Sequence, residues 1–223
     1  MTAHAAGVLP PLHVVTDDRI LADDGWLARA RPVLEAGGDH LMLHVRGPGT
    51  SGRRLFDLVR ALVPGAARAG ASLTVNDRVD VALAVGLGSV HLGARSLGPT
   101  EARALMGGGA RIGVSCHGSS ELTRARSEGA DYLFAGNVFS TASHPGSEAK
   151  GVAWFGTMVA EAGGTPVVAI GGVTPDSAPP LVALGARGVA VLGGVWGSPD
   201  PAEAVADYIA TLTRAFEEAH GGD

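Results

Sequence analysis

Short apolar runs alternate with longer helical patterns along the whole chain. The runs are rich in Val, Ile, Leu and Ala, and they lie at residues 12–17, 40–46, 72–77, 89–93, 111–117, 132–138, 166–172 and 188–194. Each run is short and almost continuously apolar, which is typical of strands that are buried on both faces of a parallel sheet. The pattern therefore predicts eight strands, each followed by a helical segment.

Several of the segments between and after these runs carry apolar residues at helical spacing. The stripes consist of Leu27, Ala30, Val33 and Leu34 in residues 25–37, of Leu55, Leu58, Leu62 and Val63 in residues 53–70, and of Val205, Ile209, Leu212 and Phe216 in residues 200–219. Eight strands that alternate with helices predict an α/β protein with a single-domain (β/α)8 TIM barrel. A doubly wound open sheet is the alternative, but the count of eight and the Gly-Gly pairs that end the last two strands favour the barrel. We expect residues 1–11 to form a flexible N-terminal lead and residues 12–219 to form the barrel domain.

The composition limits the class of protein. Apolar residues make up 46% of the chain, which is enough for a substantial core. The chain lacks the apolar run of about 18 residues that a membrane helix requires, and its N-terminus lacks the basic and apolar regions of a signal peptide. The net charge of −5 argues against a general nucleic-acid binder. The single cysteine, Cys116, excludes an internal disulfide and fits a reducing compartment, so we expect a cytoplasmic protein.

Polar residues gather at the carboxyl ends of the predicted strands. They lie at residues 16–18, 44–46, 76–78, 91–93, 115–117, 137, 171–172 and 193–194. In a TIM barrel these ends form the face on which catalysis takes place. Because the middles of the strands stay apolar, the sequence predicts a polar site at this end of the barrel.

Two Gly-Gly pairs end the last two strands, Gly171 with Gly172 in AIGGV and Gly193 with Gly194 in VLGGV. The loops after strands 7 and 8 of a barrel commonly bind phosphate, because backbone N–H groups and a helix N-terminus converge there. Glycine lets the backbone approach the phosphate oxygens without an obstructing Cβ. One pair could equally well mark a tight turn, but two pairs on neighbouring strands predict a phosphate monoester site.

Seven segments follow one another in a familiar order along residues 12–212. They are LHVVTD, NDRVDVALAVG, SVHLG, IGVSCH, GADYLFAGNVFST, PVVAIGG and GARGVAVLGGV. In this order they resemble the thiamin phosphate synthase and thiazole tautomerase superfamily of thiamin biosynthesis. The resemblance implies a barrel that holds a thiazole phosphate on the two glycine loops. It also implies a small-molecule phosphate as the partner, with no nucleic acid or membrane, and suggests a homodimer.

The synthase branch joins a pyrimidine pyrophosphate to the thiazole phosphate, and its leaving pyrophosphate calls for Mg²⁺, Lys and Arg. The chain keeps the Arg of this branch as Arg46 and one metal-binding Asp as Asp77. Pro48, Ser96 and His144 replace a Lys, a second metal-binding Asp and another Lys. One carboxylate without substrate oxygens is a poor Mg²⁺ site, so these replacements count against pyrophosphate chemistry.

The tautomerase branch moves a proton on a carboxythiazole phosphate to give the aromatic isomer, and it needs no metal. The stretch from His44 to Arg46 resembles its His-Ile-Arg pattern, and the spacing from Thr141 to Gly151 resembles its loop after strand 6. Its acid/base His is replaced by Asn137, which cannot exchange a proton at physiological pH. We therefore expect another histidine to shuttle the proton.

His144, His44 and Asn137 are the candidate catalytic residues. His144 lies in the loop after strand 6, where the alternative is an exposed histidine before a Pro-Gly turn. His44 ends strand 2 beside a predicted site arginine. The candidates for substrate binding are Arg46, Asn76, Thr141 and Ser143.

These observations predict a tautomerase-like isomerase of thiamin metabolism that works by His acid/base chemistry without a cofactor. Thiamin phosphate synthase, with Mg²⁺ at Asp77, is one alternative. The other alternative is a protein without catalytic activity that has the same barrel and binds thiazole phosphate or has a regulatory role. The reason is that the chain lacks both the lysines of the synthase and the acid/base His of the tautomerase.

Overall fold

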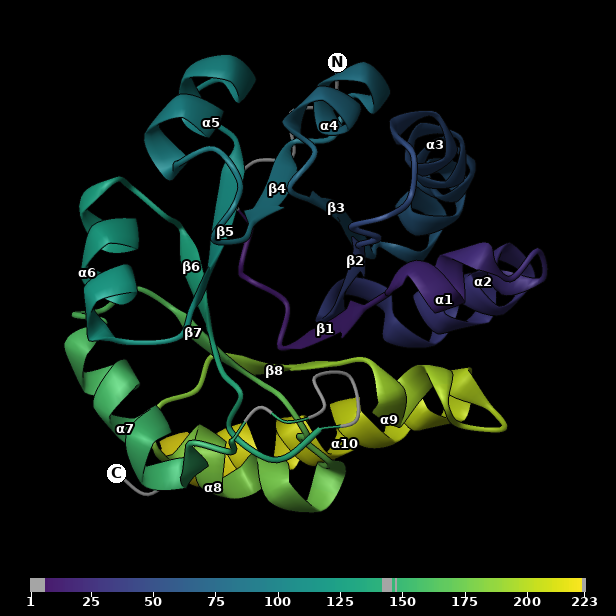
Figure 1. Cartoon of the computed structure of the whole chain (residues 1–223). Helices are drawn as coiled ribbons and strands as arrows, with labels where there is room; N and C mark the ends of the chain where they lie inside the picture. Colours follow the sequence, from purple (N-terminus) through teal and green to yellow (C-terminus); the bar gives the residue numbers. More distant parts are fainter. Residues whose placement is uncertain (1–6, 142–145, 147, 222–223) are drawn as a thin grey trace.

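The computed structural model describes residues 7–141, 146 and 148–221, and these form a closed barrel of eight parallel strands surrounded by helices (Figure 1). Each strand pairs with the next one along the chain, and the last pairs with the first. The predicted (β/α)8 barrel is confirmed, and the open sheet that was its alternative is excluded by the pairing of the first and last strands.

The strands begin close to their predicted positions and end earlier than predicted. They are β1 (Leu12–Val15), β2 (Leu41–Val45), β3 (Ser72–Asn76), β4 (Ser89–Leu92), β5 (Arg111–Cys116), β6 (Tyr132–Ala135), β7 (Val167–Ile170) and β8 (Gly188–Val191). Most of the polar residues that close each run therefore lie just beyond the sheet, in the loops at one end of the barrel.

The helices cover the outside of the barrel. They are α1 (Asp18–Ala22), α2 (Trp26–Gly37), α3 (Gly52–Ala69), α4 (Val79–Val85), α5 (Pro99–Met106), α6 (Ser119–Ser127), α7 (Gly151–Glu161), α8 (Ala178–Ala183), α9 (Gly193–Trp196) and α10 (Pro201–His220), with 3₁₀ turns η1 (Gly38–His40) and η2 (Pro175–Ser177). The three predicted stripes lie in α2, α3 and α10. Helix α10 packs against both α2 and α8 and so closes the helical ring (Figure 1). In the described residues, no helix is both long enough and apolar enough to cross a membrane.

Successive residues of each strand point alternately toward the helices and into the barrel. In β2, Leu41, Leu43 and Val45 belong to the large apolar core between strands and helices, whereas Met42 belongs to a separate cluster inside the barrel. That interior cluster consists of Leu9, Val15, Met42, Tyr132, Phe134, Val168 and Ala190.

Three fully buried histidines share the interior with this cluster, His13 on β1, His44 on β2 and His91 on β4. Their rings lie 4.2 to 5.2 Å from the ring of Phe134. Gly113 on β5 makes room for His91 and Tyr132, since a Cβ there would lie 2.5 Å from Nδ1 of His91 and would collide with the Tyr132 ring. The interior is therefore more polar than the Val, Ile and Leu layers that usually fill a TIM barrel.

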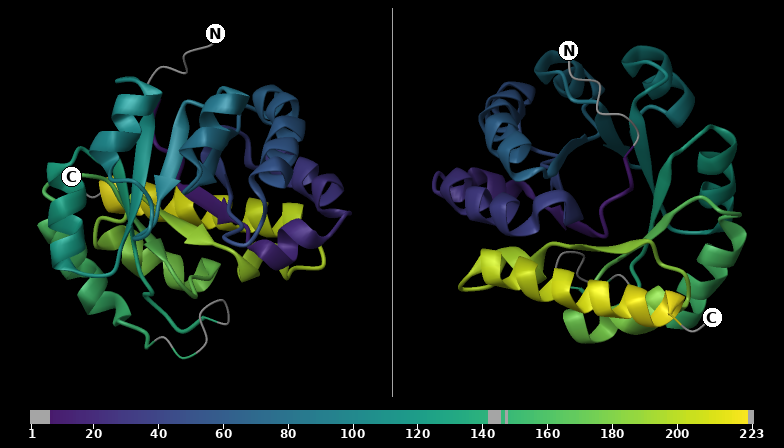
Figure 2. Two further views of the ribbon diagram at one scale, coloured as in Figure 1. Left: turned by 45° about the horizontal axis from the view of Figure 1, so that its top comes forward. Right: turned by 180° about the vertical axis from the view of Figure 1, so that it is seen from behind.

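The segment before β1 lies at the N-terminal end of the barrel (Figure 2). Leu9 enters the interior cluster, and the Pro11 carbonyl accepts a hydrogen bond from the Val189 N–H at 2.9 Å. Arg111 reaches the Gly7 carbonyl from the start of β5. The described part of the expected N-terminal lead thus covers the end of the barrel opposite the polar loops.

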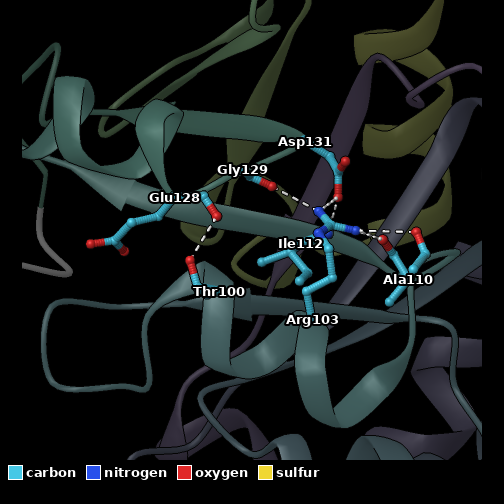
Figure 3. Close-up of polar contacts among 8 residues, drawn as sticks. Thr100, Arg103, Ala110, Ile112, Glu128, Gly129 and Asp131 are labelled. Atoms are coloured by element: carbon cyan, nitrogen blue, oxygen red, sulfur yellow. Dashed lines mark hydrogen bonds and ion pairs between the residues drawn. The ribbon is translucent and has the colours of Figure 1, made fainter.

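A cluster of polar contacts joins α5 to the start of β5 and β6 (Figure 3). The guanidinium of Arg103 donates to the carbonyls of Ala110 and Gly129 at 2.8 and 2.7 Å and pairs with Asp131 at 2.8 Å. Asp131 also accepts from the Ile112 N–H at 2.6 Å. Because these contacts connect two βα units at the N-terminal end of the barrel, they serve the fold.

Candidate active site

A cavity of about 610 Å³ opens at the carboxyl ends of the strands. Each of the eight strands, or the loop after it, contributes to its wall, as expected for the catalytic face of a TIM barrel. Its deep part is lined by inward-facing side chains of the strands, namely Val15, Asn76, Ser115, Phe134, Ile170 and Ala190.

Arg46 leaves the sheet directly after β2 and lines the cavity. Thr16 holds its backbone, since the Arg46 N–H donates to Thr16 Oγ1 at 2.8 Å and that hydroxyl donates to the Arg46 carbonyl at 2.9 Å. Its side chain has no hydrogen-bond or ion-pair partner in the part of the chain that the structure describes. A partly buried guanidinium without a protein partner is suited to bind an anionic ligand.

Asp77 lies in the turn after β3 with a φ of 64°, in the left-handed region that non-glycine residues rarely adopt. Its N–H donates to the His91 carbonyl at 2.8 Å. Its Oδ1 accepts from the Gly93 N–H at 2.8 Å and from the Ser96 hydroxyl. The loop after β4 thereby fixes this carboxylate at the cavity, with Oδ2 left for a cation or a ligand.

The backbone conformation at the first glycine pair, Gly171 and Gly172, requires glycine. Gly171 and Gly172 have φ values of 100° and 65°, which side chains rarely allow. A Cβ at Gly171 would lie 2.8 Å from Cα of Asn137, and one at Gly172 would collide with the Ser140 carbonyl oxygen. This pair therefore shapes the contact between the loops after β7 and β6, in addition to lining the cavity.

The second glycine pair differs from the first. Gly193 and Gly194 open the short helix α9 and line the cavity. Nothing lies within 4 Å of a Cβ built on Gly193, whereas a Cβ on Gly194 would collide with the Tyr208 hydroxyl. The backbone of Gly193 therefore faces open space, where an anion could approach its N–H group.

His44 lies on β2 behind the cavity wall, unlike Arg46, which follows the same strand and lines the cavity. It is fully buried, and its Nε2 lies 2.8 Å from Nδ1 of His13 while its Nδ1 lies 3.2 Å from Oδ1 of Asn76. Burial lowers the pKa of His44 to about 3, so the ring is neutral at physiological pH. Asn76 lines the cavity, and His44 reaches the cavity only through it.

The remaining predicted residues belong to the loop after β6. Asn137 and Thr141 line the cavity, close to His117 from the end of β5, whose Nδ1 lies 3.0 Å from the Gly136 carbonyl oxygen. Ser143 and His144 lie outside the described residues, so their roles stay predictions. The structure thus brings together Arg46, Asn76, Asp77, Asn137, Thr141 and both glycine pairs around one cavity.

The sequence analysis missed several cavity residues. Ser115 was placed among the polar residues at the strand ends but was not named as a site residue. It faces inward between the outward-facing Val114 and Cys116, so strict alternation along β5 could have singled it out. Burial raises the pKa of the Cys116 thiol to about 12, which is unsuited to a nucleophile. Arg95 lies in the loop after β4, where no periodic signal exists.

The charges along the cavity favour an anionic ligand. Among the described residues that line it, Arg46, Arg78 and Arg95 are cationic, and Asp77 is the one carboxylate. Arg78 is paired with Asp80, at 2.6 and 2.8 Å. Neither Arg46 nor Arg95 has a hydrogen-bond or ion-pair partner for its side chain within residues 7–141, 146 and 148–221, and Asp18 interacts with Arg46 only through its charge. Both guanidinium groups can therefore act on a ligand.

The described residues that line the cavity offer a divalent cation one carboxylate, that of Asp77. The described residues contain no group of three or more His, Cys, Asp or Glu side chains that could hold a metal ion. Mg²⁺ is commonly held by one or two carboxylates together with substrate phosphate oxygens and water. The Oδ2 atom of Asp77 fits that arrangement, in which the substrate completes the coordination shell.

Comparison with known proteins identifies relatives over most of the chain. The thiamine monophosphate synthase family matches residues 12–195. The thiamine-phosphate synthase of Chlorobium luteolum is 38% identical over 93% of this chain and 96% of its own, and that of Salinispora arenicola is 39% identical over 91% and 97%. The thiamine phosphate pyrophosphorylase structure from Pyrococcus furiosus superposes with a TM-score of 0.78 at 30% identity, covering 92% of this chain and 96% of that one.

These relatives overturn the predicted tautomerase-like isomerase. They carry the name of a synthase, which is a transferase, at 38% and 39% identity over nearly their full length. The prediction gave too much weight to three replaced residues, Pro48, Ser96 and His144. In the structure Ser96 still supports the carboxylate of Asp77, so losing a second Asp leaves the first one in place. The predicted closeness to the tautomerase branch rested on the pattern from His44 to Arg46 and on the spacing from Thr141 to Gly151, and the relatives carry the name of the synthase instead.

Proposed function

The chain belongs to the thiamine monophosphate synthase family, and on that premise we propose that it joins a pyrimidine pyrophosphate to a thiazole phosphate with release of pyrophosphate. The observation that carries this proposal is a cavity with two different anion-binding sides. Arg46 and Asp77 follow β2 and β3, and the glycine pairs follow β7 and β8 on the other side of the barrel. Two phosphorylated substrates need two such sides.

The side formed by Arg46, Asp77 and Arg95 is suited to the leaving group. Charge builds up on pyrophosphate as it departs, and preorganised cations in a partly enclosed site stabilise that charge. Arg46 has its backbone fixed by Thr16, so its guanidinium acts from a defined position. Arg95 supplies a second guanidinium at the rim.

Mg²⁺, which the synthase reaction requires according to the family resemblance, would neutralise pyrophosphate charge when bound. In this chain Asp77 would hold it through Oδ2, because Gly93 and Ser96 already occupy Oδ1. The orientation of the carboxylate is therefore set before any ligand arrives.

The glycine side is suited to the phosphate of the thiazole substrate. Gly193 leaves its backbone open to the cavity, and Gly171 and Gly172 keep the loop after β7 close to Asn137 and Ser140. Backbone N–H groups without a neighbouring Cβ bind phosphate oxygens directly. Thr141 also lines this region of the cavity and adds a hydroxyl.

The test is a direct assay with the purified full chain. Incubation with pyrimidine pyrophosphate, thiazole phosphate and Mg²⁺ should form thiamin phosphate and pyrophosphate in equal amounts, and neither should form when one substrate is omitted. Arg46→Ala should remove most of the activity. Arg53→Ala serves as the matched control, because Arg53 is exposed on α3 and pairs with Asp57. A protein that binds both substrates in calorimetry and forms no product would contradict the proposal and identify a silent binder.

A further inference from the structure

The hydrogen-bonded chain from His13 through His44 to Asn76 runs from the barrel interior to the cavity. Nδ1 of His13 lies 2.8 Å from Nε2 of His44, and Nδ1 of His44 lies 3.2 Å from Oδ1 of Asn76. Both rings are fully buried, and Asn76 is 8% exposed where it lines the cavity. A side chain at a substrate site is thus held by two residues that cannot touch the substrate.

The direction of these hydrogen bonds follows from the orientation of the Asn76 amide, which has Oδ1 toward His44. Burial lowers the pKa of both rings, to about 3 for His44, so each ring is neutral and carries one N–H. The carbonyl oxygen of Asn76 only accepts, so the proton of His44 is on Nδ1 and its Nε2 accepts. His13 must then donate from Nδ1, which leaves its Nε2 as an acceptor.

That last nitrogen has no hydrogen-bond partner among the described residues, although it is buried. A leucine at position 13 would remove this unpaired nitrogen, but it would leave Nε2 of His44 buried without its donor. The histidine therefore does not serve packing alone. Its hydrogen bond to His44 is the one that leads toward the cavity.

We propose that His13 and His44 are positioning residues that act through Asn76, fixing its amide so that the NH₂ group of Asn76 faces the cavity as a hydrogen-bond donor. Because Oδ1 of Asn76 is occupied by His44, Nδ2 is the end that remains for a ligand. Asn76 directly precedes Asp77, on the pyrophosphate side of the cavity, so the donor serves the pyrimidine pyrophosphate. This part of the inference rests on the proposed function.

The tautomers can be measured without any substrate. In long-range ¹H–¹⁵N spectra of the full chain with ¹⁵N-labelled histidine at pH 7.5, His13 and His44 should both be Nδ1–H tautomers. Burial lowers the pKa of His13, whereas a hydrogen bond to the backbone of Pro10 raises it. The Pro10 backbone is therefore an alternative acceptor for the N–H of the His13 ring. A His13 that donated there would reverse each bond of the chain, and Nε2–H tautomers in both rings would overturn the proposal.

A double-mutant cycle tests the coupling to the site. His13→Leu should raise the KM for pyrimidine pyrophosphate about three- to tenfold, the range of one neutral hydrogen bond, and leave kcat within about twofold. In an Asn76→Ala background the same change should alter KM less than about twofold, because the residue through which it acts is gone. An equal effect in both backgrounds would mean that His13 has a structural role only.

Two further variants separate the loss of the hydrogen bond from a general disturbance of folding. His13→Gln can still donate to His44 and should keep the KM of the unmodified chain. Thr74→Val is the control, because Thr74 is buried, pairs with His44 across the strands and has no hydrogen-bond partner for its hydroxyl among the described residues. If the chain makes no thiamin phosphate, the same cycle is measured as Kd for pyrimidine pyrophosphate by calorimetry. The proposed function would then fail, while the coupling between His13 and Asn76 would still be confirmed or refuted.

Discussion

Lowering the pH should unfold this protein through its buried histidines. Burial lowers the pKa of His13, His44 and His91, to about 3 for His44, and the mutual repulsion of the charged rings adds to the effect in His13 and His91. A histidine of the unfolded chain has a pKa of about 6.5. Below that pH the unfolded state binds protons that the folded state does not, so stability is complete above about pH 6.5 and decreases as the pH falls.

The magnitude follows from this difference in proton binding. Each histidine that stays neutral in the folded state lowers the free energy of unfolding by about 2 kcal/mol between pH 7.5 and pH 5. Three such residues give about 6 kcal/mol, which is comparable to the whole stability of many domains. Asp18 and Asp80 have a lowered pKa, and their contributions are lost only below about pH 4, outside this range.

Urea unfolding followed by far-UV circular dichroism at a series of pH values measures this effect. The free energy of unfolding should fall steeply below about pH 6.5, and His44→Gln should reduce the slope by about one third, since one of three titrating groups is removed. His40→Gln is the control, because His40 is exposed and lies outside the barrel interior. A free energy of unfolding that stays constant from pH 7.5 to 5, or equal slopes for the chain and its His44→Gln variant, would show that the buried histidines do not control the stability.

Four further outcomes are expected. Arg46→Ala should lower kcat/KM about a hundredfold with unchanged melting temperature, and an unchanged kcat/KM would contradict its role at the leaving group. Asp77→Asn should raise the Mg²⁺ concentration for half-maximal activity about tenfold, measured by titration with the metal. Gly171→Ala should lower the melting temperature because its φ is 100°, whereas Gly193→Ala should fold normally and weaken binding of thiazole phosphate in calorimetry. Arg103→Met should lower the free energy of unfolding by about 1–3 kcal/mol without changing KM, because it removes a charged donor from four acceptors far from the cavity.

The fold could be predicted because its signals are local and repeated. Each apolar run reports burial on both faces of a strand, and eight of them with helices between leave few arrangements other than a closed barrel. The same regularity placed Arg46, Asp77 and the two glycine pairs at one end of the barrel before any contact was known. Chain direction alone determines this, because all strands of a parallel barrel end on the same face.

The choice between the synthase and the tautomerase reaction could not be made from the sequence in the same way. Three replaced residues in the sequence suggested a tautomerase, but a replacement shows only that one group is absent from one position. The contact of Ser96 with Asp77 lies between loops 19 residues apart, and it appears only when β3 and β4 are adjacent. The relatives along the full chain then decided between the branches.

Residue type and spacing were enough to predict the barrel, the end at which its polar loops gather and the two glycine loops. The residues inside the barrel and behind the cavity wall could be identified only once the strands were placed side by side. His13 and His44 are 31 residues apart, and nothing in their local sequence indicates that their rings meet at 2.8 Å. Inward-facing residues from different strands become neighbours only on closure of the barrel, and this is why His44 lies behind Asn76 and does not line the cavity.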